Sequence, residues 1–289
     1  MAASKSGRLM SIPLKITPEE SASSSLDRSS PLISFEDVSK VFNLREATFH
    51  AVNGLNLAIR PGEFVTLVGP SGCGKSTLLN MVAGLMKPTS GIVSYRGVPV
   101  VGINQRVGYM TQADHLLPWR TIAGNISVPL EISRIGKGAR RARIEELIEL
   151  VGLTGFEASY PTQVSGGMRK RAALARLLAS DPETLLMDEP FGALDAQLRL
   201  AMQTELLNVQ ARLGKTVVFV THDLDEAISL ADRCVVFSSR PGRIVQVIET
   251  GLPRGRDLLA LRFDPSFLKL ARGLWETLTP ELKSVERPT

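Results

Sequence analysis

The chain has 289 residues, of which 44% are hydrophobic and 22% are charged, and its 34 basic and 29 acidic residues give a net charge of +5. This composition excludes a chain disordered throughout, a collagen and a disulfide scaffold. The charge excess is what a solvated surface gives, so we expect no nucleic-acid partner. Two cysteines, Cys73 and Cys234, are too few for a disulfide framework or a zinc cluster and indicate a reducing compartment.

The N-terminal residues 1–31 are rich in serine and lack hydrophobic periodicity, which is typical of a disordered tail. A transit peptide is the alternative, although Glu19, Glu20 and Asp27 are unusual in such segments. Nowhere does an apolar run approach the roughly 18 residues that span a membrane. We therefore expect any work at a membrane to be done peripherally, from its cytoplasmic face, through a partner.

Ordered structure is predicted from about residue 32. Alternating apolar side chains at residues 55, 57 and 59 indicate a strand, and the continuous apolar run 64–68 indicates a strand buried on both faces. A glycine-rich loop and a helix to about Met86 follow. Strand patterns then recur at residues 107–110, 184–187, 216–220 and 234–237, with helical patterns between them. This alternation predicts an α/β fold with a parallel sheet covered on both faces.

The block from about 115 to 180 is mostly helical and is predicted to be an inserted helical subdomain, with an amphipathic helix over 140–151 and another over 165–180. Residues 255–289 are predicted to form a helical extension of one or two surface helices. The leucines expected to pack there are Leu258, Leu261, Leu268, Leu270, Leu274 and Leu278. The domain between the tail and this extension spans residues 32–254.

The loop between the buried strand and the first helix matches the pattern G-x-x-x-x-G-K-[ST] of a phosphate-binding loop. Its residues are Gly69, Pro70, Ser71, Gly72, Cys73, Gly74, Lys75, Ser76 and Thr77. Glycines let backbone N–H groups surround a phosphate, and the helix N-terminus attracts the same anion. We expect the lysine to reach the β- and γ-phosphates of ATP and the Ser76 hydroxyl to ligate Mg²⁺. The cysteine is interpreted as passive rather than as a reactive thiol.

Two acidic residues, Asp188 and Glu189, end the apolar strand that begins at residue 184. Ligands bind at the carboxyl ends of parallel strands, so Asp188 is predicted to share the Mg²⁺ with Ser76. Glu189 is predicted to be the general base that polarises the attacking water. Taken alone, the pair could equally cap a helix; beside a phosphate loop the catalytic interpretation is favoured.

A second phosphate-type helix start occurs at Ser165-Gly166-Gly167-Met168, after Val164. The serine caps the helix, and the glycines leave its N–H groups open. One chain has no evident use for two γ-phosphate sites, whereas two chains arranged head to tail would each supply this helix to the other's ATP. The sequence therefore predicts a homodimer with shared sites.

Two further polar residues follow short strands. The amide of Gln112 could reach the metal or the water, so the residue is a candidate for both roles. The imidazole of His222 could touch the γ-phosphate. A lone histidine is more often structural, but the order of these motifs along the chain favours the catalytic interpretation.

Over about residues 33–250 the sequence resembles the ATP-binding subunits of ABC transporters. The resemblance implies that residues 69–77 are the Walker A loop, Gln112 the Q-loop, Ser165 to Met168 the signature, Asp188 with Glu189 Walker B and the base, Asp195 the D-loop aspartate, and His222 the H-loop. The signature departs from LSGGQ at Val164 and Met168, and methionine lacks the hydrogen bonds of glutamine. Phe42 resembles the aromatic residue that stacks on adenine, with Phe49 as the alternative.

A closer resemblance lies in residues 116–121, 187–199 and 239–243, which are similar to the nitrate, sulfonate and taurine group of bacterial importers. It implies two transmembrane permease subunits, an extracytoplasmic solute-binding protein acting indirectly, and a small anion as cargo. Trp119 could lie beside the permease or simply pack within the helical subdomain. The rival readings are import of another solute, an exporter subunit, a ribosome-associated ABC protein, and a chromosome-maintenance ATPase, whose long heptad arms this sequence lacks.

Overall fold

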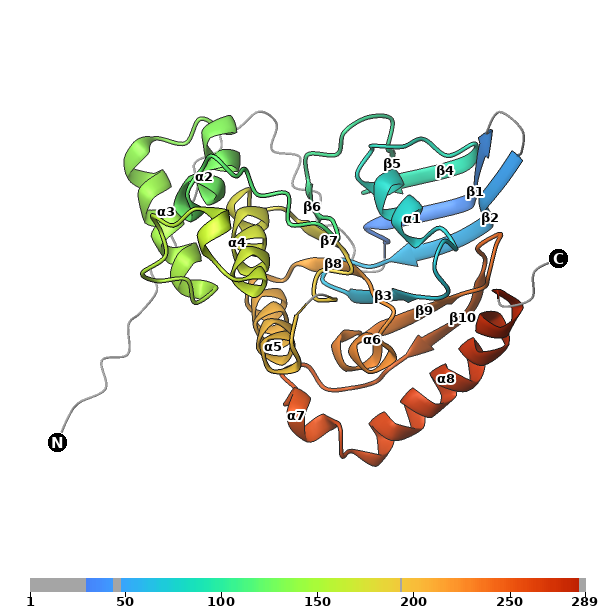
Figure 1. The fold of residues 1–289 in the computed structure, drawn as a ribbon. Helices are drawn as coiled ribbons and strands as arrows, with labels where there is room; N and C mark the ends of the chain where they lie inside the picture. The colour runs from blue at the N-terminus through green and yellow to red at the C-terminus, as the bar shows by residue number, and fades with distance from the viewer. Residues whose placement is uncertain (1–29, 44–47, 193, 286–289) are drawn as a thin grey trace.

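The computed structural model describes residues 30–43, 48–192 and 194–285. The tail predicted over 1–31 lies almost wholly outside the described residues, as does Ala193 of the D-loop. Two sheets organise the described chain (Figure 1). The smaller is antiparallel, in the order β2-β1-β4-β5. Its strands are β1 (Ile33–Asn43), β2 (Thr48–Ile59), β4 (Ser90–Tyr95) and β5 (Val98–Pro99).

The larger sheet has six strands in the order β10-β9-β3-β8-β7-β6, and all neighbours are parallel except β10 and β9. Its strands are β3 (Phe64–Val68), β6 (Val107–Met110), β7 (Thr184–Asp188), β8 (Thr216–Val220), β9 (Arg233–Phe237) and β10 (Ile244–Glu249). All five residues of β3 and of β8 are buried, as the apolar runs predict for strands covered on both faces. The predicted mixed architecture is therefore present.

Three apolar clusters fill the space around the larger sheet. Because side chains of a strand alternate in direction, β3 contributes to all three: Val65 and Leu67 to the first cluster, Phe64 to the second and Val68 to the third. The first cluster lies between the two sheets and includes α1 (Lys75–Val82). The second joins the sheet to the helical block, and the third packs it against the C-terminal helices.

The helical block contains α2 (Ile122–Ile132), α3 (Lys137–Leu150), the 3₁₀ turn η1 (Pro161–Gln163) and α4 (Gly166–Ala179). Figure 1 shows it as a separate lobe beside the β6 edge. The remaining helices follow strands β7, β8 and β10. They are α5 (Ala196–Leu213), α6 (Leu224–Leu230), α7 (Leu258–Leu261) and α8 (Pro265–Val285).

Two sequence expectations about helices are wrong. Helix α1 ends at Val82 rather than near Met86, because Gly84 has a left-handed φ of 71° and lies so close to Gly102 that a β-carbon would be 1.7 Å from its carbonyl oxygen. In α8, Leu268 is 54% exposed, whereas Phe267 is buried. Adjacent helical residues point about 100° apart, so only one of the two can face the core.

Candidate nucleotide-binding site

The predicted site residues meet at the carboxyl edge of the larger sheet because the strands that precede them are neighbours. Strand β6 pairs with β7, β7 with β8, and β8 with β3. In register, Met110 lies opposite Met187, and Asp188 lies opposite Val220. Gln112, Glu189 and His222, which follow these strands, are thereby brought to one edge, as is the loop after β3. This edge is where open α/β sheets bind ligands.

The segment 69–77 comprises the loop after β3 and the first residues of α1, and it is packed against β2. Gly74 caps the helix with a φ of 97°. A β-carbon on it would be 2.6 Å from Val52 Cγ2 and 2.9 Å from the Ala51 carbonyl oxygen. Both the conformation and the lack of space require glycine here. The backbone of the loop is thus fixed by its contact with β2.

Lys75 lies inside this loop and is only 7% exposed. Its Nζ donates to the carbonyl oxygens of Gly69, at 2.7 Å, and Pro70, at 2.9 Å. Cys73 is buried, with Sγ 3.6 Å from the same Nζ. Burial raises the pKa of the Cys73 thiol, which disfavours the reactive thiolate and supports the passive interpretation.

Ser76 and Asp188 lie together beside this lysine. Burial raises the pKa of Asp188, while a hydrogen bond from the Ser76 hydroxyl and the charge of Lys75 act in the opposite direction. The Ser76 residue is itself exposed. A hydroxyl and a carboxylate, both hard oxygen donors, therefore lie next to the phosphate loop, the donor set that Mg²⁺ prefers.

Glu189 is the meeting point of the three predicted catalytic residues. Its Oε2 accepts a hydrogen bond from Gln112 Nε2 at 3.2 Å and lies 3.4 Å from His222 Nδ1. The residue has a left-handed φ of 47°, which is strained for a non-glycine residue, and its N–H donates to the Val220 carbonyl at 3.0 Å. This backbone bond to β8 holds the strained residue in place. The Gln112 side chain therefore contacts Glu189, beside His222, whereas the Ser76 hydroxyl contacts Asp188.

The predicted signature lies at the start of α4. The Ser165 Oγ accepts from the Met168 N–H at 3.2 Å, and both Ser165 and Gly166 are exposed. Asp195 caps α5 in the same way, accepting from the Leu198 N–H at 2.9 Å. The two helix starts touch, since a β-carbon on Gly167 would be 1.9 Å from Leu198 Cδ2. Both caps are thus at the surface of one packed unit.

Sequence reasoning missed a set of cations on α4 that contact the segment carrying Gln112. Lys170, only 6% exposed, donates to the Gln112 carbonyl oxygen. Arg169 pairs with Asp114 at 3.2 Å, and Arg176 donates to the carbonyls of residues 114 and 115, both at 2.7 Å. The signal that could have identified this contact is a lysine next to the apolar residues of the helix predicted over 165–180, because a buried lysine needs a polar partner.

The two candidate adenine-stacking rings are in contact. The ring centroids of Phe42 and Phe49 are 6.2 Å apart, and Lys40 Nζ lies 5.2 Å from the Phe42 centroid. Phe42 and Phe49 come from paired positions of β1 and β2. Trp119, in contrast, is 71% exposed, so it does not pack inside the helical block.

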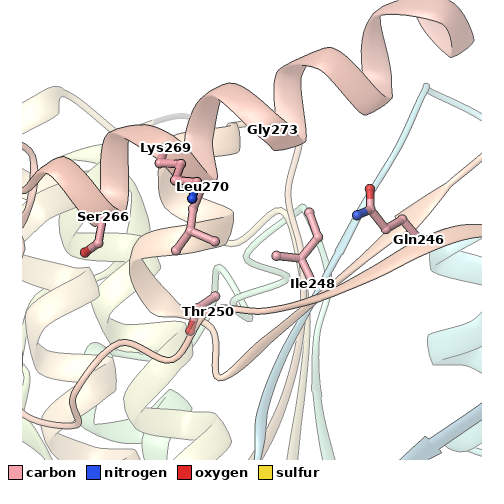
Figure 2. Close-up of a pocket in the computed structure, with 7 residues that line it drawn as sticks. All are labelled: Gln246, Ile248, Thr250, Ser266, Lys269, Leu270 and Gly273. Atoms are coloured by element: carbon pink, nitrogen blue, oxygen red, sulfur yellow. The ribbon is translucent and has the colours of Figure 1, made fainter.

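A separate surface groove of about 400 Å³ lies between β10 and α8 (Figure 2). It is lined by Gln246, Ile248, Thr250, Ser266, Lys269, Leu270 and Gly273. None of the residues predicted for the nucleotide site contributes to it.

Comparison with known proteins decides the family. The sequence profile of the ABC transporter family matches residues 52–192. A taurine import ATP-binding protein of Burkholderia pseudomallei is 42% identical, with 86% of this chain and 98% of the relative covered. An aliphatic sulfonates import ATP-binding protein of Bacillus cereus is 43% identical, with coverages of 78% and 88%. The chain belongs to the ABC transporter family, as an ATP-binding subunit.

The structural comparison agrees. A dimeric ATP-binding cassette in a post-hydrolysis state, bound to ADP and phosphate, superposes with a TM-score of 0.69 at 32% identity, covering 75% of this chain and 98% of the cassette. The predicted fold class, a P-loop ATPase core with mixed sheets, is confirmed. So are the resemblance to the nitrate, sulfonate and taurine group and the assignment as an ATP-binding ATPase. No helix in the described part of this ABC subunit is long and apolar enough to cross a membrane.

Proposed function

We propose that this chain is the ATP-hydrolysing subunit of an ABC importer, attached peripherally to the cytoplasmic face of the membrane, with Glu189 as the hydrolytic base. The observation that carries the proposal is the convergence of Gln112 and His222 on Glu189 Oε2, at 3.2 and 3.4 Å. The side chain of Glu189 is 26% exposed, so a water molecule can reach it. A carboxylate fixed by an amide and an imidazole is suited to orienting and deprotonating that water.

The other site residues have complementary roles in this proposal. The backbone N–H groups of residues 72–77 and the Lys75 ammonium bind the phosphates of ATP, and Phe42 stacks on adenine. The Nζ of Lys75 now donates to carbonyl oxygens and would exchange these for phosphate oxygens on binding. His222, 66% exposed, is free to contact the γ-phosphate. In this proposal the subunit contacts both the adenine and the phosphates of ATP, and it places the base beside the terminal phosphate.

Magnesium fits the donors present. The Ser76 hydroxyl and the Asp188 carboxylate would hold it, with the amide oxygen of Gln112 as a third ligand in the proposal. When bound, Mg²⁺ would supply positive charge beside the phosphate oxygens. In the described structure the Gln112 amide is directed to Glu189, so we expect this side chain to change partners when the metal and nucleotide bind.

We also propose that two copies share their sites head to tail, with the signature residues 165–168 and Asp195 of each chain facing the ATP of the other. Two features support this: the helix start at Ser165 is exposed, and the hydrogen bonds that Ser165 accepts from the Met168 and Arg169 N–H groups both come from α4. A related cassette has been solved as a dimer with ADP and phosphate. Closure around ATP would be favoured only while the γ-phosphate contacts exist.

Mixed dimers test the shared site. Lys75→Ala and Ser165→Arg chains are each expected to be inactive as homodimers, but mixing them restores one site with both elements intact, so phosphate release should reappear. Ser133→Arg, on an exposed residue of the same helical block, controls for the added charge and should stay active alone. Absence of recovery, together with a monomeric Glu189→Gln chain in sedimentation with ATP, would refute the shared site.

The cargo is proposed to be a small anion such as nitrate, a sulfonate or taurine. Support comes from relatives named for taurine and aliphatic sulfonates import. The exposed Trp119 suits a contact with a permease subunit, because aromatic residues are enriched in interfaces. Selectivity would then reside in two permease subunits and in an extracytoplasmic binding protein.

Reconstitution tests the cargo. ATP hydrolysis by the complete complex should rise when the binding protein is loaded with nitrate, taurine or an alkanesulfonate, while the isolated subunit should not respond to these anions. Amino acids and sugars serve as controls. Stimulation by a sugar alone would refute the anion assignment and leave the importer assignment intact.

A further inference from the structure

The loop between β9 and β10, residues 238–243, is clamped between β2 and the phosphate loop. The Gly242 N–H donates to the Ala51 carbonyl at 3.0 Å, and the Gly242 carbonyl accepts from the Asn53 N–H at 3.1 Å. A β-carbon on Gly242 would be 1.9 Å from the Cys73 carbonyl oxygen. The approach is therefore so close that only glycine fits, and the loop cannot move without disturbing either neighbour.

Arg240 extends from this loop and makes two contacts, one with the phosphate loop and one with β2. Its Nε donates to the Gly72 carbonyl of the phosphate loop at 3.0 Å. Its Cζ lies 4.2 Å from the centroid of the Phe49 ring, a cation–π contact. Phe49 in turn packs at 6.2 Å against Phe42, with the ring planes inclined by 43°. One guanidinium thus joins the phosphate loop to the aromatic pair.

We propose that Arg240 is a positioning residue for ATP, which holds the aromatic pair Phe42 and Phe49 at a fixed place relative to the phosphate loop. The inference rests on the proposed stacking of adenine on Phe42. The two parts of the site belong to different elements, since the rings come from β1 and β2, and residue 72 precedes α1. A ligand that contacts both parts binds more tightly when the two are already in place.

Arg240 has its own support from the C-terminal helix. Glu281 of α8 accepts through Oε2 from the Ser239 N–H at 2.8 Å and from the Ser239 hydroxyl at 3.2 Å. Ser239 immediately precedes Arg240, so these bonds fix the backbone from which the guanidinium extends. The C-terminal extension is thereby connected to the nucleotide site through one loop. Loss of the Glu281 carboxylate should loosen Arg240 without removing it.

The first experiment compares two ligands on Arg240→Ala. The dissociation constant for ATP should rise about three- to tenfold, the range expected for loss of a cation–π contact and a hydrogen bond. Inorganic tripolyphosphate, which reaches only the phosphate loop, should bind within about twofold of wild type. The turnover number at saturating ATP should stay near wild type while KM rises. Arg243→Ala removes the same charge from the same loop, where the described contact is made by the Arg243 backbone, and should change none of these values.

Further variants separate positioning from a general structural role. Arg240→Lys keeps the cation and should recover part of the ATP affinity. Glu281→Gln should raise the ATP dissociation constant less than Arg240→Ala, and the double variant should be no weaker than Arg240→Ala, because Glu281 acts through the arginine. Additive losses of ATP affinity in the double variant would show that Glu281 acts independently of Arg240. They would overturn the proposed support of Arg240 by α8.

Three results would overturn the inference. They are unchanged ATP affinity in Arg240→Ala, equal loss for ATP and tripolyphosphate, and equal loss in Arg243→Ala. Phe42→Ala separates the inference from the proposal beneath it. If Phe42→Ala weakens ATP binding and Arg240→Ala does not, the stacking of adenine on Phe42 is supported and the positioning role of Arg240 is refuted. If neither variant weakens binding, the adenine placement falls as well.

Discussion

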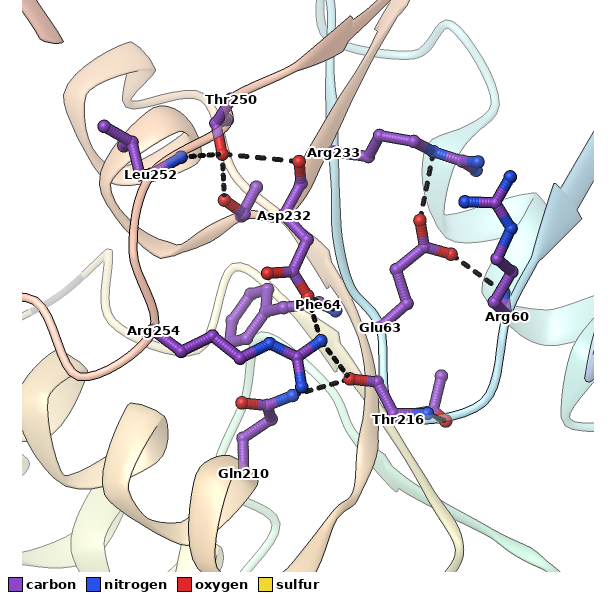
Figure 3. A network of polar contacts seen from close by, with 12 residues as sticks. Arg60, Glu63, Phe64, Gln210, Thr216, Asp232, Arg233, Thr250, Leu252 and Arg254 are labelled. Atoms are coloured by element: carbon purple, nitrogen blue, oxygen red, sulfur yellow. Dashed lines mark hydrogen bonds and ion pairs between the residues drawn. The ribbon is translucent and has the colours of Figure 1, made fainter. Parts of the chain in front are cut away.

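The two ends of the parallel strands are built for different purposes. At the amino ends, polar groups contact one another in a network around Glu63 and Asp232 (Figure 3). Glu63, 7% exposed, accepts from the Arg60 N–H at 2.8 Å and pairs with Arg233 at 3.3 Å. Asp232 accepts from the Phe64 N–H at 3.0 Å and pairs with Arg254 at 3.1 Å.

At the carboxyl ends, the same strands lead to polar groups that are exposed or can exchange their present hydrogen-bond partners for others. Ser76 is exposed, His222 is 66% exposed, and Lys75 binds backbone carbonyls with hydrogen bonds that a phosphate can replace. Under the proposed function, one edge of the sheet stabilises the fold while the other keeps groups available for a ligand. Substitutions at the two edges should therefore affect different measurements.

Glu189→Gln should have the largest effect. It removes the proposed base while keeping a side chain that can bond Gln112, so ATP turnover should fall about 10²- to 10⁴-fold, and ATP binding and the melting temperature should change little. Phosphate release and a nucleotide titration check this, with the exposed Glu249→Gln as the matched control. Near-normal turnover in Glu189→Gln would remove the residue from the role.

Lys75→Ala should come next. Charge-assisted hydrogen bonds contribute about 1.5–3 kcal/mol, so the affinity for ATP should fall about 10- to 100-fold. Equilibrium titration with ATP measures it, and Lys87→Ala, on an exposed lysine just after α1, should bind as wild type. If the two variants bind ATP equally well, Lys75 is not the phosphate ligand.

Asp232→Ala should have the opposite effect, a loss of stability without a loss of ATP binding. It leaves the buried Phe64 N–H without an acceptor, which should lower the free energy of unfolding by about 1–3 kcal/mol. Asp232→Asn keeps an acceptor and loses the charge that pairs with the exposed Arg254 and acts on the buried Arg256, so it should cost less stability than Asp232→Ala. Denaturant unfolding measures both. ATP affinity should be unchanged, and a loss of affinity would contradict the separation of the two edges.

Glu226 tests the comparison further. It lies beside the candidate nucleotide-binding site, but it is buried and hydrogen-bonded like the residues at the opposite edge of the sheet. It is 6% exposed and accepts from Gln203 Nε2 at 2.9 Å and from the Thr221 hydroxyl. Burial raises the pKa of Glu226 above its ordinary value of 4.5. The folded state therefore retains this proton at a pH where the unfolded chain has lost it.

The resulting pH dependence has a definite sign. As pH rises from 4.5 to the raised folded pKa, the wild type should lose stability relative to Glu226→Gln by about 1.4 kcal/mol for each pH unit of that interval. At higher pH the difference between the two proteins should stay constant. Thermal unfolding of both proteins across this range tests it. A difference that grows in favour of the wild type with rising pH would contradict the assignment.

Local patterns allowed much of the site to be predicted. The phosphate loop, the cap at Ser165 and the strand before Asp188 depend on neighbouring residues, and the structure contains each of them. The roles given to these residues stay predictions. The boundaries 32–254, 115–180 and 255–289 also stay predictions, because helix and strand limits do not by themselves define domains.

Contacts between segments far apart in the chain could not be predicted from the sequence. The stacking of Arg240 on Phe49 joins residues far apart in the chain, and the bond from Lys170 to the Gln112 carbonyl depends on how α4 packs. The expectation for Leu268 failed because leucines were chosen by type, whereas the face of α8 that meets the core is set by phase and places Phe267 there. Apolar composition alone does not determine helix phase.

The contact between Gly167 and Leu198 has an evolutionary consequence. Since a β-carbon at position 167 would lie 1.9 Å from Leu198 Cδ2, any larger residue there requires the end of the Leu198 side chain to move, a smaller residue at 198, or a shift of one helix against the other. The two positions are therefore coupled, although they lie on different helices. A larger side chain at 167 is accommodated most readily together with a new side-chain conformation, or a smaller side chain, in the first turn of α5.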